Sequence, residues 1–102
     1  MAHKDFIATY YIGLNDKDLK IQLLTTQEYI QTIKTLIKEH CNLSAYSLDV
    51  IQGCYKGITE TTITIMLVND ILPRCLLELI KNELNQECIM EVIKKECDVN
   101  FI

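Results

Sequence analysis

The chain has 102 residues and a formal net charge of −4, and 49% of its residues are hydrophobic. This length predicts one domain over residues 1–102, and the apolar content argues against disorder. The ten Lys and Arg residues are scattered, whereas nucleic-acid binding needs a concentrated positive surface. No stretch approaches the roughly 20 apolar residues that cross a bilayer. We therefore expect a cytoplasmic protein that partners neither nucleic acid nor membrane.

Residues 5–13 alternate apolar and other side chains with the period of two that predicts a β-strand. The polar segment that follows, residues 14–24, predicts a loop, with a short edge strand in its later half as the alternative. Thr25 and Glu28 have the spacing of a capping box, which predicts that a helix starts at residue 25 or 26. Apolar residues three and four apart continue that helix to residues 40–42.

Two further alternating runs, residues 45–55 and 60–68, predict a β-hairpin, with Lys56 and Gly57 in the connection. Gly53, inside the first of these strands, indicates either a bulge or a close approach of backbone. The sequence therefore places two adjacent antiparallel strands in the middle of the chain.

The second predicted helix has Asn69 or Asp70 as its N-cap, carries Pro73 in its first turn and ends at Asn85. Residues 87–95 then alternate again and predict a last strand. The order is strand, helix, strand, strand, helix, strand.

This order is that of the ferredoxin-like α+β fold, a βαββαβ sandwich. Right-handed crossovers predict a four-stranded antiparallel sheet of order 4-1-3-2, with both helices on one face. The side chains expected to fill the space between the sheet and the helices are Ala8, Tyr10, Ile12, Leu48, Val50, Ile63, Ile65 and Leu67.

The other face of the sheet has no predicted cover and mixes Thr with large apolar side chains. Contiguous exposed apolar residues on neighbouring strands usually mark an interface. We therefore expect a homodimer that contacts through this face or an edge strand, and a monomer with a partly apolar open face is the alternative. The predicted interface residues are Ile7, Thr9, Ile51, Thr64, Met66 and Ile93.

Several short motifs occur in an order that resembles a family of small bacterial and phage-associated proteins of uncharacterised function. They are residues 10–16 (YYIGLND), residues 53–55 (GCY), Glu60, and residues 85–89 (NQECI). The resemblance spans nearly the whole chain and implies a ferredoxin-like fold, but it implies no activity. Cys88 stands where the family usually has Ser.

A candidate ligand site lies where the first strand ends and the last strand begins. These strands are predicted neighbours, and antiparallel pairing places the end of one beside the start of the other. Tyr11, Asn15, Gln86 and Glu87 are therefore expected to converge at one end of the sheet. An aromatic ring with a few polar groups suits a small-molecule ligand. The alternative is that these residues only cap loops at a solvated strand end.

No catalytic set, metal site or cofactor motif is predicted. The five Cys residues lack the close spacing of a zinc or redox site and are expected to be reduced and mostly buried. His3 and His40 have no second metal ligand at useful spacing. Tyr55 and Glu60 flank the hairpin turn and are expected to form a cross-strand pair.

Three functions remain open. The first is a non-enzymatic, homo-oligomeric protein that binds a small molecule or a protein through the open sheet face. The second is a phage- or plasmid-encoded inhibitor of a host defence system. The third is a cofactor-independent enzyme of the dimeric α+β barrel kind, with Tyr11 and Glu91 as acid and base groups near the open face.

Overall fold

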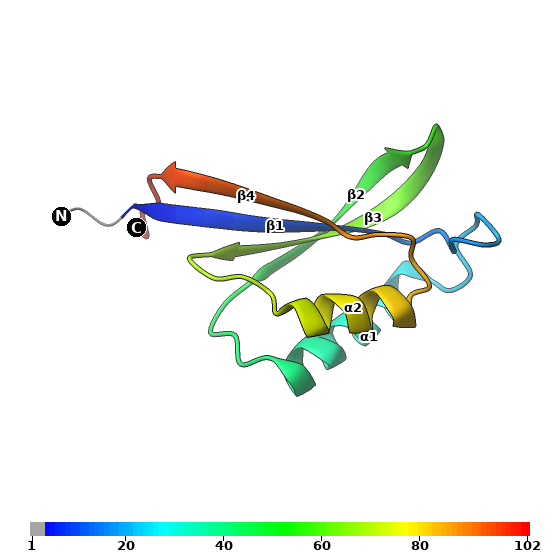
Figure 1. Cartoon of the computed structure of the whole chain (residues 1–102), viewed down its shortest axis with the longest axis horizontal. Helices are drawn as coiled ribbons and strands as arrows, with labels where there is room; N and C mark the ends of the chain where they lie inside the picture. Colours follow the sequence, from blue (N-terminus) through cyan, green and yellow to red (C-terminus); the bar gives the residue numbers. More distant parts are fainter. Residues whose placement is uncertain (1–3) are drawn as a thin grey trace.

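The computed structural model describes residues 4–102 and contains four strands and two helices. The elements in chain order are β1 (Asp5–Gly13), α1 (Thr26–His40), β2 (Ser47–Tyr55), β3 (Ile58–Val68), α2 (Arg74–Glu83) and β4 (Met90–Cys97). The strands form one antiparallel sheet of order β2-β3-β1-β4. Both helices lie on the same side of this sheet (Figure 1). The predicted ferredoxin-like fold and the predicted strand order, read from the opposite edge, are confirmed.

The segment between β1 and α1 is the predicted loop throughout, and the alternative of a short edge strand is not formed in residues 14–25. The start of α1 matches the sequence prediction, because the Thr25 hydroxyl accepts a hydrogen bond from the Glu28 backbone N–H at 3.2 Å. This bond satisfies one of the free amides of the first turn. Neither helix in residues 4–102 is both long and apolar enough to cross a membrane.

The start of α2 differs from the prediction. The helix begins at Arg74 behind Pro73, and neither Asn69 nor Asp70 caps it. Asn69 instead adopts a positive φ of 57°, and its side-chain oxygen accepts a hydrogen bond from the Phe6 N–H at 3.0 Å. The amide that resembled a helix cap therefore ties the end of β3 to the beginning of β1.

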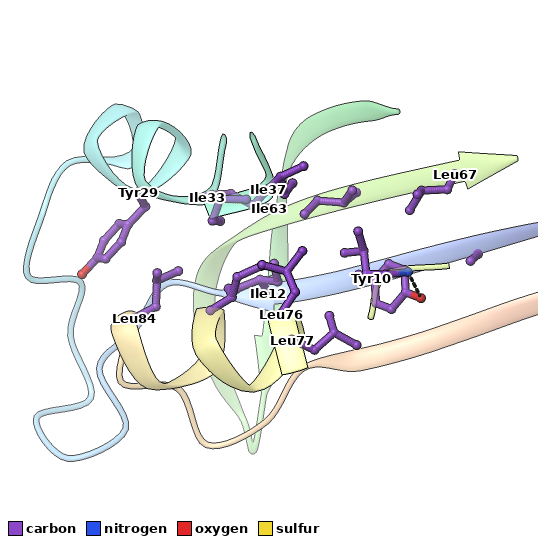
Figure 2. Close-up of a cluster of buried hydrophobic side chains, with 14 of the residues drawn as sticks. Tyr10, Ile12, Tyr29, Ile33, Ile37, Ile63, Leu67, Leu76, Leu77 and Leu84 are labelled. Atoms are coloured by element: carbon purple, nitrogen blue, oxygen red, sulfur yellow. Dashed lines mark hydrogen bonds between the residues drawn. The ribbon is translucent and has the colours of Figure 1, made fainter. Parts of the chain in front are cut away.

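The hydrophobic core lies between the sheet and the two helices (Figure 2). The side chains predicted to point inward from the two central strands, β1 and β3, are all buried. The two predicted inward residues of β2 are less well covered, because β2 is an edge strand: Leu48 is half-buried and Val50 is 41% exposed. The buried core residues are Ala8, Tyr10, Ile12, Leu14, Tyr29, Ile33, Ile37, Ile63, Ile65, Leu67, Leu72, Leu76, Leu77, Ile80 and Leu84.

The pairing of β4 with β1 corrects one predicted interface residue. Ile93 lies opposite Ala8, whose side chain is buried under the helices. Directly opposed residues of antiparallel strands share a face, so Ile93 lies on the helix side and its placement on the open face was wrong. Met90 and Val92 occupy the open face instead. Glu91 also lies on the helix side, which removes it as an acid or base group of the open face.

The cysteines also differ from expectation, because none of the five is buried. Cys75 is exposed since it follows Arg74 at the start of α2, where the buried stripe begins only at Leu76. All five are free thiols. Cys54, Cys75 and Cys88 are exposed, and Cys41 and Cys97 are half-buried.

Candidate functional site

A cavity of about 540 Å³ opens on the face of the sheet that the helices leave uncovered. Its floor comes from open-face residues of all four strands, and its walls come from the β2–β3 hairpin and the loops that follow β1 and precede β4. The volume lies within the roughly 300–1,000 Å³ that small-molecule sites occupy. The cavity is therefore large enough to hold a small-molecule ligand.

The four residues predicted to bind a ligand, Tyr11, Asn15, Gln86 and Glu87, all line this cavity. Antiparallel pairing of β1 with β4 brings them together, as the sequence argument expected. Gln86 is buried, and its side-chain N–H groups donate to the backbone oxygens of Asn15 at 2.9 Å and Leu84 at 3.1 Å. Gln86 thus holds the two loops together, while a ligand-binding role for the four residues stays a prediction.

Glu60 also lines the cavity, in a position that differs from the prediction. It was expected to pair with Tyr55, but the register places it opposite Gly53. Its carboxylate lies against Gly13, where a Cβ atom would overlap it. The Asn15 backbone N–H donates to Glu60 Oε2 at 3.1 Å. The glycine at the end of β1 was the available signal, since glycine within a strand often marks a close approach.

Gly53 marks a second close approach on the floor of the cavity. The β2–β3 register is continuous there, so the residue does not form a bulge. A Cβ atom at Gly53 would lie 2.7 Å from Thr62 Oγ1. Of the two alternatives that the sequence left open, the structure shows the close approach.

Asp16 lies at the cavity wall, but neighbouring amides occupy its carboxylate. It accepts hydrogen bonds from the backbone N–H groups of Asp18 at 3.0 Å and Leu19 at 2.9 Å. The Asn85 side-chain amide donates to its other oxygen at 2.7 Å. The hydrogen bond from Asn85 and those from the two backbone amides lower the pKa of Asp16. Asp16 therefore shapes the loop and is not available to a ligand.

A cluster of four side chains lies at the rim of the cavity. Lys56 Nζ and Glu87 Oε1 form an ion pair at 2.9 Å, and the Cys88 thiol donates a weak hydrogen bond to the Tyr55 hydroxyl at 3.8 Å. The bond to Lys56 lowers the pKa of Glu87, and the same bond raises the pKa of Lys56. The hydrogen bond with Cys88, followed by burial, raises the pKa of Tyr55. Lys56 and Glu87 are thus both charged at neutral pH.

Glu60 differs from the other acidic groups of the cavity. Within residues 4–102 its carboxylate has no ion-pair partner, and its one hydrogen bond comes from the Asn15 backbone. Lys17 and Lys20 also line the cavity, and the Lys20 ammonium donates to the Lys17 backbone oxygen. The cavity therefore offers an uncompensated carboxylate to a cation and lysines to an anion. No group of His, Cys, Asp and Glu side chains in the described part of the chain is arranged to hold a metal ion.

Comparison with known proteins shows similarity of fold. No family model and no curated protein matches the sequence. The structure of a phage SAM lyase in complex with S-methyl-5′-thioadenosine superposes with a TM-score of 0.66 at 19% identity, covering 94% of this chain and 84% of that one. A phage SAM lyase in the apo state gives a TM-score of 0.67 at 20% identity, with 94% and 86% covered.

Proposed function

We propose that this protein binds S-adenosylmethionine (SAM) in the open-face cavity and cleaves it with release of S-methyl-5′-thioadenosine. The observation that carries the proposal is the uncompensated Glu60 carboxylate, because SAM carries a permanent positive charge on its sulfonium sulfur. The names of the two similar structures supply the substrate class and the reaction.

Glu60 is suited to hold a sulfonium for two reasons. The Asn15 N–H donates a hydrogen bond to one carboxylate oxygen at 3.1 Å, and the other oxygen receives no hydrogen bond within residues 4–102. The group is half-buried in the cavity, where attraction between opposite charges is stronger than in bulk water. The rings of Tyr11 and Tyr55 also line the cavity and provide apolar surface for an adenine base.

The chemistry of the proposed reaction is internal to the substrate. The bond between sulfur and the side-chain carbon breaks, and both of its electrons go to sulfur, which becomes the neutral thioether of S-methyl-5′-thioadenosine. The electron-deficient carbon regains an electron pair in one of two ways: a neighbouring C–H bond becomes a C=C bond and its proton passes to solvent, or the substrate's own carboxylate oxygen bonds to that carbon and closes a lactone. The protein's part is to bind the cation, orient it and exclude water.

Glu60 interacts with the sulfonium most strongly before the bond breaks, because the positive charge on sulfur falls in the transition state. Removing the carboxylate should therefore weaken binding more than it slows bond cleavage. We expect Glu60→Gln to lower kcat/KM at least tenfold, mainly through KM. The matched control is Glu83→Gln, which removes an exposed carboxylate at the end of α2.

The test is incubation of the purified protein with SAM and measurement of S-methyl-5′-thioadenosine by liquid chromatography and mass spectrometry. Release that needs Glu60 and survives in the control supports the proposal. Absence of both cleavage and binding contradicts it. Binding of SAM without release of product favours the second candidate, a non-enzymatic binding protein, which the same cavity supports.

We also propose that the apolar part of the open face joins two copies of the chain. Met66 and Ile51 are each 40% exposed there, and Val92 of β4 is 45% exposed. Ile7, Thr9 and Thr64 lie on the same face and are half-buried. Light scattering should give twice the chain mass of 11.8 kDa, and the mass of one chain contradicts the proposal. A role as inhibitor of a host defence system stays a prediction.

A further inference from the structure

The ion pair between Lys56 and Glu87 joins segments that the sheet keeps apart. Lys56 lies in the turn between β2 and β3, and Glu87 lies in the loop that leads into β4. Since β1 separates β3 from β4 in the sheet, β3 and β4 are two strand spacings apart, or about 10 Å. Both residues line the cavity, so the pair crosses its rim.

Lys56 and Glu87 form an exposed ion pair beside the ring of Tyr55. The Lys56 ammonium lies 5.4 Å from the centroid of the Tyr55 ring and 2.9 Å from Glu87 Oε1. Both charged side chains are exposed, and such pairs contribute little to stability. The pair can therefore shift its contacts toward a ligand at small cost to the fold.

We propose that Lys56 and Glu87 bind the amino-acid end of the ligand, with Lys56 on its α-carboxylate and Glu87 on its α-ammonium group. This inference rests on the proposed function and extends it to recognition of the substrate's zwitterionic end. A zwitterion placed antiparallel to the ion pair brings each charge next to an opposite one. The resulting charge-assisted hydrogen bonds are stronger than bonds between neutral groups.

The other charged groups of the cavity fit this role less well. Lys17 and Lys20 supply positive charge, but the nearby Asp16 carboxylate is occupied by Asp18, Leu19 and Asn85. Among the described cavity residues, an ammonium and a carboxylate face each other only at Lys56 and Glu87. With Glu60 left for the sulfonium, each of the three charges of SAM meets an opposite charge.

The test compares three ligands by isothermal titration calorimetry. S-adenosylhomocysteine has the amino-acid end but a neutral sulfur, S-methyl-5′-thioadenosine lacks the amino-acid end, and SAM has both features. We expect Lys56→Met and Glu87→Gln each to weaken S-adenosylhomocysteine binding on the order of tenfold. Their affinity for S-methyl-5′-thioadenosine should stay unchanged. Lys38→Met, an exposed change on α1, is the control.

The binding results with the three ligands distinguish a failure of this inference from a failure of the proposed function. The inference is overturned if Lys56→Met leaves S-adenosylhomocysteine binding unchanged. It is also overturned if Lys56→Met weakens the binding of S-adenosylhomocysteine and of S-methyl-5′-thioadenosine equally, because the amino-acid end is then not bound at Lys56. If Lys20→Met alone produces the selective loss, the carboxylate lies at Lys20 and the inference is again overturned. If none of the three ligands binds the unaltered protein, the proposed function fails and the inference fails with it.

Discussion

Two neighbouring tyrosines of β1 show how differently the two faces of the sheet are built. Tyr10 points toward the helices and is fully buried, and its hydroxyl oxygen accepts a hydrogen bond from the Leu72 N–H at 3.0 Å (Figure 2). Tyr11 points the other way, is half-buried and lines the cavity. Alternation along a strand places them on opposite faces. The covered face thus stabilises the fold, and the open face is left for binding.

The two faces also differ in how completely their polar groups are hydrogen-bonded. Every buried side-chain nitrogen or oxygen within residues 4–102 has a hydrogen-bond partner. On the open face, by contrast, the half-buried Glu60 carboxylate accepts one hydrogen bond, from a backbone N–H, and forms no ion pair with any of residues 4–102. Groups that a protein leaves incompletely paired in a cavity are candidates for ligand contact.

Among the substitutions that test this difference between the faces, Tyr10→Phe should change the free energy of unfolding most. The change leaves the Leu72 N–H buried without its acceptor and should lower the free energy of unfolding by about 1–3 kcal/mol. Tyr11→Phe, on the open face, is the control and should cost much less. Urea denaturation of the two variants measures the difference, and equal losses would remove the distinction between the faces.

The raised pKa of Tyr10 also predicts that the stability of the fold falls at alkaline pH. Burial, followed by a hydrogen bond with Glu91, raises the pKa of Tyr10 to about 12 from its ordinary value of 10. The folded state therefore holds the phenol proton more tightly than the unfolded state does. This stabilisation is complete below pH 10 and is lost as pH rises toward 12. In Tyr10→Phe this part of the alkaline loss should be absent, while Tyr11→Phe should retain it.

A smaller effect is expected from Gly13→Ala at the floor of the cavity. The new Cβ would overlap the Glu60 carboxylate, which must turn aside, at a cost of about 1–2 kcal/mol. The same change in a Glu60→Ala background has no carboxylate to displace and should cost less. A double-mutant cycle of unfolding free energies measures this coupling, and equal costs in both backgrounds would contradict the placement of Glu60.

The strands, the helices and their order were predictable because the hydrophobic period of each element is clear. The face of β4 was not, because both alternating sets of that edge strand mix apolar with charged or exposed side chains, and only pairing of Ile93 with Ala8 decides between them. The start of α2 was misplaced because Asn69 bonds to β1 instead of capping a helix.

The position of Glu60 depended on the hairpin turn. Lys56 and Gly57 both have positive φ, at 51° and 79°, and form a two-residue turn that places Tyr55 opposite Ile58. Such turns match the twist of the strands they join. The predicted second strand of the hairpin began at Glu60, which implied a longer loop and a different register. Because the observed turn is shorter than the predicted one, Glu60 pairs with Gly53 and not with Tyr55.

The most direct test of a functional open face is an NMR titration of the ¹⁵N-labelled protein with S-adenosylhomocysteine. The Asn15 amide reports on the cavity because its N–H is bound to Glu60. We predict that shifts concentrate on this amide and on Gly53 and Lys56 at the cavity, while the Leu76 and Ile80 amides of α2 stay in place. Shifts centred on the helices, or none at saturating ligand, would contradict the account.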